Sequence, residues 1–265
     1  MKIEVKGISE YLPEQVIDND SFRKQHPDWN MGLVVERAGV QRRHIARADE
    51  TALDLSLEAC KKLFSQHAGL HEKIDALIVC TQSPDYIMPP NSSILHKLLD
   101  LPDTVFAFDF NLACSGYVYG LALSQGLIAA QIVENVLFVT ADTYSKYIHP
   151  DDRSARVLFG DGAAASWICR SNSSRGVIDI LCGTSGKEHD KFMIPAGGCR
   201  LPLSDKTRVP SVDENNNTRT LENIHMDGMA VLAFVNSKVP LQIHALLEKN
   251  HTSLDDLELI IFHQA

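Results

Sequence analysis

The chain has 265 residues, of which 45% are hydrophobic and 22% are charged, with acidic and basic side chains interspersed. This composition is typical of a soluble globular protein that is large enough for two domains or one doubled architecture. The net charge of −9 argues against an extended nucleic-acid surface. The N-terminus lacks the apolar region of a signal peptide, and no later run is expected to span a membrane.

The six cysteines show no CxxC pairing, which disfavours a disulfide framework or a structural zinc site. Cys169, Cys182, Cys199 and His189 have spacings that fit no usual metal pattern, so we expect no metal site. We expect a cytoplasmic protein that binds no nucleic acid and no membrane and carries no cofactor.

The first part of the chain alternates strand and helix patterns. Residues 1–9 read as a strand, and Thr51 to Leu70 repeat apolar residues at helical spacing. Residues 74–82 form a continuous apolar run, which is typical of a strand that is buried on both faces. Between them, residues 37–45 hold four cationic or potentially cationic side chains. They are either a solvated loop or a patch that faces phosphates or an acidic partner.

The stretch from Thr104 to Glu134 predicts a strand followed by a helix. Phe106, Phe108 and Phe110 alternate as in a strand, and the residues from Ser115 are apolar nearly all round, as in a helix buried at the centre of a molecule. Cys114 lies at the junction. Free N–H groups and the dipole at a helix start lower a thiol's pKa, so Cys114 is predicted to be a nucleophile.

The rest of the chain predicts a second strand system. Residues 135–142 are an apolar strand, and residues 156–170 read as two strands hinged at Gly160-Asp161-Gly162, a structural turn without P-loop spacing. Another strand is expected at 176–184 and one more buried strand at 254–262. The irregular residues 183–222 predict a lid, a binding loop or partial disorder.

Two segments resemble each other at a fixed offset. HEKIDALIVCTQ (71–82) and SLDDLELIIFHQ (253–264) each carry an acidic turn followed by an apolar strand. The pattern predicts two similar halves rich in βαβ units. The second half then lacks a counterpart of the residues that follow Gln82, so we expect a C-terminally truncated chain.

Six segments in order resemble β-ketoacyl-[acyl carrier protein] synthase III, a condensing enzyme of the thiolase-like group. They are GISEYLPEQVIDN near the start, RAGVQRRHIA (37–46), LACSGYVYGL (112–121), FGDGAAA (159–165), MDGMAVLAF (226–234) and FHQA (262–265). The resemblance implies a thiolase-like doubled α/β sandwich of αβαβα layers, with an N-terminal half at 1–170 and an incomplete C-terminal half at 171–265.

The resemblance also implies a Cys-His-Asn catalytic set. The Cys corresponds to Cys114 and the His to His263, whereas the Asn would follow Ala265. The implied reaction is ping-pong: Cys114 accepts an acyl group from acyl-CoA, and malonyl-acyl carrier protein then loses CO₂ and attacks the acyl-enzyme, in fatty acid or polyketide synthesis. The family is homodimeric. Without the Asn, we expect residues 1–265 alone to be inactive in condensation.

The resemblance assigns Arg37, Arg153, Met88 and Phe159 to substrate binding. The family has an adenine-stacking Trp four positions before the Arg that matches Arg37, but this chain has Leu33 there, and Trp29 fits only with an insertion. Arg153 matches the opposing Arg. Met88 takes the place of a bulky residue that crosses the dimer and limits the acyl site, where a flexible Met could admit a longer or branched chain.

Three alternatives remain at this point. Hydroxymethylglutaryl-CoA synthase places a Glu where this chain has Gln82, and an amide cannot transfer that proton. A synthase III-like acyltransferase to oxygen or nitrogen acceptors is the second. The third is a noncatalytic partner subunit that only binds carrier protein, which the presence of both Cys114 and His263 disfavours.

Overall fold

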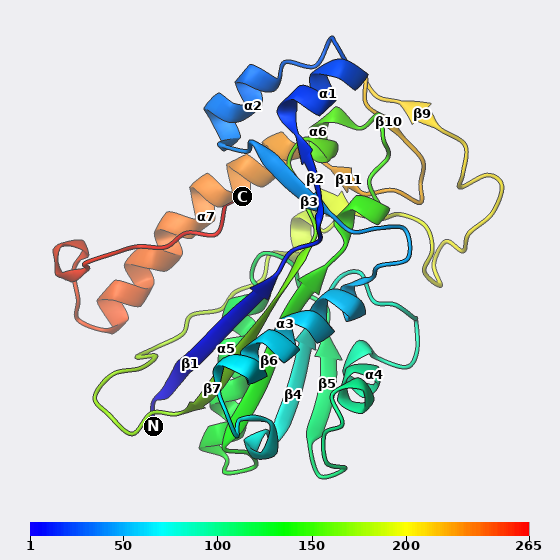
Figure 1. The fold of residues 1–265 in the computed structure, drawn as a ribbon. Coiled ribbons are helices and arrows are strands. Elements are labelled where there is room, and N and C mark those ends of the chain that lie inside the picture. Colours follow the sequence, from blue (N-terminus) through cyan, green and yellow to red (C-terminus); the bar gives the residue numbers. More distant parts are fainter. Residues whose placement is uncertain (265) are drawn as a thin grey trace.

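A five-stranded mixed sheet forms the centre of the computed structural model, which describes residues 1–264 (Figure 1). The strand order is β1-β7-β6-β4-β5. β4 runs parallel to both β5 and β6, whereas β7 runs antiparallel to β6 and β1. The strands are β1 (Ile3–Tyr11), β4 (Ala76–Cys80), β5 (Phe106–Phe110), β6 (Asn135–Asp142) and β7 (Gly162–Arg170).

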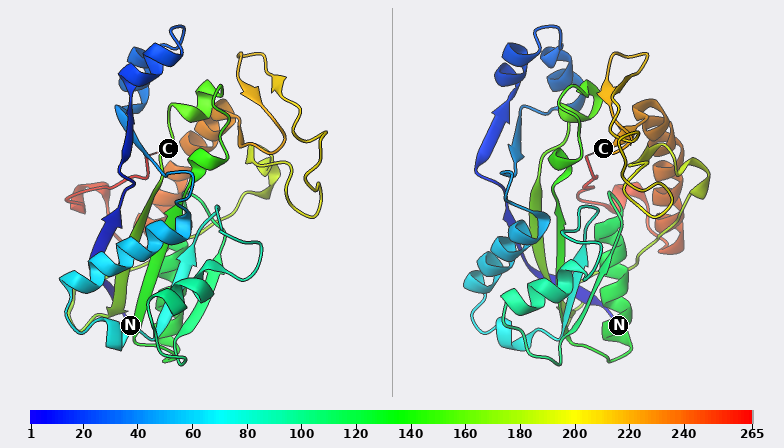
Figure 2. Two further views of the ribbon diagram at one scale, coloured as in Figure 1. Left: turned by 45° about the vertical axis from the view of Figure 1, so that its right-hand side comes forward. Right: turned by 90° about the vertical axis from the view of Figure 1, so that its right-hand side faces the viewer.

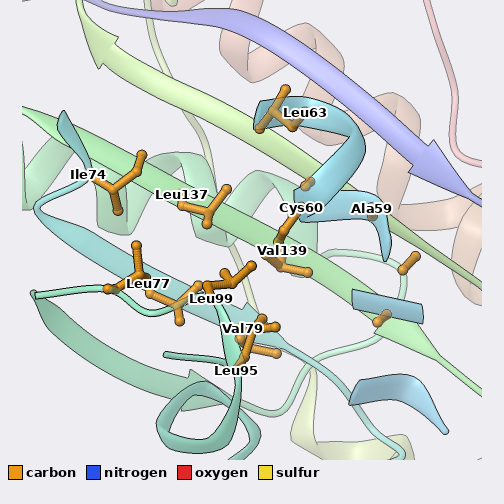
Figure 3. Packing of buried hydrophobic residues seen from close by; sticks show 14 of the residues in the cluster. Ala59, Cys60, Leu63, Ile74, Leu77, Val79, Leu95, Leu99, Leu137 and Val139 are labelled. Carbon is orange, nitrogen blue, oxygen red and sulfur yellow. The ribbon is translucent and has the colours of Figure 1, made fainter. Parts of the chain in front are cut away.

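Helices cover both faces of this sheet. α3 (Ala52–Gln66) and α4 (Asn91–Leu98) pack on one face, where Leu63, Leu95 and Leu137 belong to one buried cluster (Figure 3). α5 (Gly116–Ala129) packs on the other face against Phe138. Every residue of β4 is buried, as expected for a central strand between two helical layers.

Local sequence signals account for these elements. Thr51 begins α3 with a capping box, because its hydroxyl accepts the N–H of Asp54 while the Asp54 carboxylate accepts the N–H of Thr51. Gly120 lets α5 approach the sheet, because a Cβ there would lie only 2.1 Å from Cζ of Phe138. The helix therefore sits on a sheet surface that a larger residue would push away.

The remaining elements lie around this core. The antiparallel pair β2–β3 and the helices α1 and α2, which connect the two strands, form one end of the molecule (Figure 1). In Figure 2, right, α3, the sheet, α5 and α7 follow one another across the view. The elements outside the central sheet and its helices α3, α4 and α5 are β2 (Gln15–Asp18), α1 (Asn19–Gln25), α2 (Met31–Ala38), β3 (Arg42–Ile45), α6 (Arg153–Arg156), β8 (Phe192–Met193), β9 (Ser211–Val212), β10 (Thr218–Arg219), β11 (His225–Met226) and α7 (Gly228–Lys249).

Three expected strands do not form within residues 1–264. Residues 257–264 extend without strand pairing, and Ile261 is 85% exposed, because no neighbouring strand offers a ladder. Residues 176–184 are joined to β1 by the hydrogen bond from Val177 N–H to Ile3 C=O, but they form no strand ladder. In place of the expected strand at 156–159, Arg156 ends α6, which the Asp152 carboxylate caps, and residues 157–159 form no strand.

The expectation that the helix after Cys114 is buried all round is wrong, and the expectation that no run spans a membrane is left untested. α5 buries Gly116, Gly120, Ser124 and Ile128 but exposes other apolar side chains, because within residues 1–264 no second sheet covers its outer side. α7 has the length and composition of a membrane span, with a mean hydropathy of 1.3. One such helix is weak evidence, because length and composition are its only support.

The two-half organisation is a prediction that the structure leaves open. The five-stranded sheet draws all its strands from residues 1–170, which agrees with the proposed first half. In the described part of 171–265, strands occur only as the pairs β8–β11 and β9–β10. Residues 183–222 are largely irregular, as predicted.

Candidate active site

Cys114 lies in a short connection between β5 and α5, at the carboxyl end of the parallel strands. β4 and β5 end together, with Cys80 opposite Phe110, and β6 places Thr140 beside Cys80. Their following residues therefore share one edge of the sheet (Figure 1). In open α/β sheets this edge is where ligands bind. The sequence prediction that Cys114 sits between a strand and a helix is confirmed.

The prediction that the pKa of Cys114 is lowered overall is wrong, because burial outweighs the backbone hydrogen bond that lowers it. The residue is exposed and reachable. Burial of the thiol nevertheless raises its pKa above the ordinary value, its backbone hydrogen bond opposes that rise, and the nearby Asp142 carboxylate adds to it. The sequence showed the start of α5 but gave no sign that the thiol would be desolvated or that a carboxylate from β6 would lie nearby.

Asp142, at the end of β6, is a partly buried acidic group of this site. Its Oδ1 accepts hydrogen bonds from Gln82 N–H at 2.7 Å, the Ser83 hydroxyl at 3.0 Å and the Thr81 hydroxyl at 3.2 Å. Burial raises the pKa of Asp142 to about 6, and these hydrogen bonds limit the rise. The carboxylate thus ties the residues after β4 to the end of β6.

Tyr144 links this carboxylate region to an aromatic group. Its hydroxyl donates to Oε1 of Gln82. Its ring packs edge-on against Phe159, with centroids 5.4 Å apart, and lies 6.1 Å from the ring of Phe192. Burial, followed by the charges of Asp142 and Cys114, raises the pKa of Tyr144.

Sequence reasoning missed Asp142, and it missed Tyr144. The signal was their position directly at the end of a fully apolar strand, where polar residues of neighbouring parallel strands meet. Phe159 was assigned by resemblance, and the structure places it against Tyr144 in this aromatic group. Asp161 is structural, as expected, because it accepts N–H bonds from Ala46 and Ser145 and so fixes the turn that carries Tyr144.

His263 lies in the exposed C-terminal segment. Its neighbour Gln264 donates to the backbone C=O of Ala38 at 2.7 Å, which holds the segment near the end of α2. Within residues 1–264 no hydrogen bond joins His263 to Cys114. Their catalytic pairing therefore stays a prediction.

The cationic segment 37–45 divides into two kinds of side chain. Arg37, in the last turn of α2, and Arg42 are exposed. Arg43 is only 2% exposed and donates to the Val157 C=O, and burial lowers its pKa to about 10. His44 is partly buried beside the Pro13 C=O. Hence only two of the four residues can face a partner.

Arg153 begins α6 and is exposed. α2 and the residue that ends α6 meet in one apolar cluster, which contains Met31, Val157 and Trp29. Trp29 is 8% exposed and stacks on His26, with centroids 3.8 Å apart, so its ring is already covered. Arg37 and Arg153 thus lie on neighbouring elements, without a free Trp between them.

Met88 lies far out on the loop between β4 and α4. It is 79% exposed, and its neighbour Ile87 is 91% exposed. Within residues 1–264 the structure shows no packing of Met88 over Cys114. An exposed apolar tip of this kind is compatible with the predicted contact across a dimer, which remains a prediction.

A buried ion pair fastens the irregular segment to the site. Arg219 donates to the Asp152 carboxylate at 2.7 Å, and Asp152 is fully buried. Asp213 accepts from the same guanidinium at 3.2 Å. Since Asp152 also caps α6, one carboxylate positions both the residues around Arg219 and the helix that begins at Arg153.

Comparison with known proteins identifies the family. Residues 108–186 match the family model of 3-oxoacyl-[acyl-carrier-protein] synthase III. The chain is 33% identical to the β-ketoacyl-[acyl-carrier-protein] synthase III of Caldanaerobacter subterraneus, over 98% of this chain and 76% of that protein. The chain belongs to the 3-oxoacyl-[acyl-carrier-protein] synthase III family. The Solibacter usitatus enzyme is 32% identical over the whole chain and 77% of its own length.

Solved synthase III structures show the same architecture. A 2.1 Å crystal structure of a 3-oxoacyl-(acyl-carrier-protein) synthase III has a TM-score of 0.94 and 38% identity, covering 97% of this chain and 77% of its own. The Burkholderia xenovorans enzyme has a TM-score of 0.87 and 32% identity, covering 100% and 74%. The thiolase-like α/β fold is therefore confirmed, and the chain is a condensing enzyme of the acyltransferase class.

Proposed function

We propose that Cys114 carries the acyl group in the condensation that begins fatty acid or polyketide chains. The observation that carries this proposal is the exposed thiol at the head of α5, on the sheet edge where β4, β5 and β6 end. Cys182 and Cys199 are also exposed, but both lie outside this edge, and Cys60, Cys80 and Cys169 are buried.

The first half-reaction is transfer to sulfur. The Cys114 thiolate attacks the carbonyl carbon of an acyl thioester, and the C–S bond of the donor breaks as CoA thiol leaves with a proton. Because its pKa is raised, the thiolate is scarce at neutral pH, and deprotonation becomes part of the cost of this step.

The second half-reaction forms the carbon–carbon bond. Malonyl-acyl carrier protein loses CO₂, the resulting carbanion attacks the acyl-Cys114 carbonyl, and the Cys114 thiolate leaves. Charge that develops on the two thioester oxygens needs hydrogen-bond donors. The N–H of Cys114 is proposed to donate to the carbonyl oxygen of the acyl-Cys114 thioester. His263 is proposed to donate to the enolate oxygen that forms as the malonyl thioester loses CO₂.

Substrate binding is proposed to use Arg37 and Arg153, which are both exposed. Arg37 and Arg153 lie on elements that share one apolar cluster, and guanidinium groups bind phosphates well. Because the ring of Trp29 is covered, it is not free to stack on the adenine of CoA. The same arginines therefore also suit a donor without adenine, the phosphopantetheine of a carrier protein. Met88 is proposed to reach the acyl site of the partner subunit in a cytoplasmic homodimer.

Intact-mass spectrometry after mixing with acetyl-CoA tests the acyl-enzyme. We expect one added acetyl group, lost in Cys114→Ala and retained in Cys182→Ala, which removes another exposed thiol. We expect the acylation rate to rise with pH through the alkaline range, because the thiol pKa lies above its ordinary value. An adduct that persists in Cys114→Ala would refute the assignment.

A further inference from the structure

Three polar side chains stand together at the sheet edge beside Cys114. Gln82 is the second residue after β4, Asn111 directly follows β5, and Tyr144 is the second residue after β6. β4 lies between β5 and β6, so Gln82 is central in the group. Asn111 also belongs to the connection that carries Cys114, three positions further on.

Hydrogen bonds join the three into one network. Nε2 of Gln82 donates to Oδ1 of Asn111 at 3.0 Å, and Oε1 of Gln82 accepts the hydroxyl of Tyr144. The Gln82 backbone is fixed separately, through its N–H bond to Asp142. The amide is therefore held in one orientation by partners on both sides.

Within the described residues, the network contains amide N–H groups that donate to no protein group. An amide NH₂ carries two protons. Within residues 1–264, Nδ2 of Asn111 donates to no protein group, and Gln82 Nε2 uses one proton, on Asn111. Tyr144 has its hydroxyl turned to Gln82 and its ring turned to Phe159 and Phe192. Cys114 lies near this group, since its charge contributes to the raised pKa of Tyr144.

We propose that the Gln82–Asn111–Tyr144 network selects acyl donors that carry a hydrogen-bonding oxygen, such as a hydroxyl, within the first few carbons of the chain. This inference rests on the proposed acylation of Cys114. A saturated chain would displace water from the free amide protons and leave them unpaired, which is costly. A hydroxyl accepts one of these protons instead. Sites that hydrogen-bond a substrate hydroxyl reject analogues that lack it.

Paired donors of equal chain length test the selection. The acylation rate of Cys114 by 3-hydroxybutyryl-CoA and by butyryl-CoA is followed by intact-mass spectrometry, as kcat/KM for each. The ratio of the two cancels any effect on CoA binding or on thiol reactivity. Gln82→Met removes the amide at similar length, and Tyr144→Phe removes the hydroxyl but keeps the ring. Tyr119→Phe is the control, because its hydroxyl donates to the Gly183 C=O away from the network.

We expect the unmodified protein to prefer the hydroxylated donor by about tenfold, and both network variants to lower this ratio. Tyr119→Phe should keep the original ratio. Equal or faster reaction of butyryl-CoA with the unmodified protein would overturn the inference, as would a ratio that neither variant changes. If no thioester acylates Cys114 in the folded protein, the proposed function itself fails; acylation without a preference removes this inference alone.

Discussion

Replacing Gly120 by Ala should destabilise the protein through a single steric clash. The new Cβ would lie 2.1 Å from Cζ and 2.3 Å from Cε1 of Phe138. Carbon atoms prefer a separation of about 3.5–4.0 Å, so helix and ring must separate by about 1.5 Å. Phe138 is fully buried, and its ring packs against those of Phe110 and Tyr117. The ring therefore has little room to move away from the new Cβ. Overpacking of this kind costs about 1–3 kcal/mol.

Gly126→Ala on the same helix is the matched control, because a Cβ there meets no atom within 4 Å. Both variants gain about 1 kcal/mol from the better helix propensity of Ala. Their difference in the free energy of unfolding therefore isolates the packing cost. In urea denaturation followed by circular dichroism, we expect the midpoint of Gly120→Ala to lie about 0.3–1 M below that of Gly126→Ala. Equal midpoints would show that α5 does not rest on Phe138 as described.

Three further changes test other contacts. Asp142→Asn should flatten the pH dependence of stability. Because the pKa of Asp142 is raised to about 6 in the folded state, the folded state binds more protons than the unfolded state between about pH 4 and 6. The contribution of Asp142 to the free energy of unfolding is therefore present below about pH 4 and is lost as the pH rises through about 6. Denaturation midpoints of both proteins from pH 4 to 7 check this. Asp152→Ala should cost about 3–5 kcal/mol by leaving Arg219 without its buried partner, whereas Asp151→Ala, at an exposed site, should change the midpoint little. Arg153→Ala should raise KM for acyl-CoA about tenfold with little change in kcat if the guanidinium holds a phosphate; an unchanged KM would contradict that role.

The sequence was sufficient for elements whose signals are local. The continuous apolar runs of β4 and β6 predicted strands correctly, since every residue of β4 is buried and most of β6 is buried, as in central strands. The helical spacing from Thr51 predicted α3, whose cap was expected at Thr51 or Asp49 and is Thr51. The position of Cys114 followed from a strand pattern that changes to a helical one. The family resemblance was also confirmed, because six motifs in order are far more specific than any one of them.

Sequence reasoning failed where a partner decides the outcome. Residues 257–262 have a strand's composition, but a strand requires a neighbour with which to form a ladder, and within residues 1–264 they have none. The buried state of Arg43 depends on the distant Val157 C=O, and the raised pKa of Cys114 depends first on burial of the thiol and then on the distant Asp142. These contacts join residues that are 28 or more positions apart, and no local pattern reports them.

The pairing of β1 with β7 has a consequence for how the chain folds. Ile3 lies opposite Arg170, so the first strand to be synthesised finds its partner only after nearly the whole first half exists. At about 5–20 residues per second, β1 waits on the order of 10 s on the ribosome with both edges unpaired. Closing so long a loop is slow, which makes the arrival of β7 the expected commitment step of folding. Before that moment the nascent sheet is most open to aggregation.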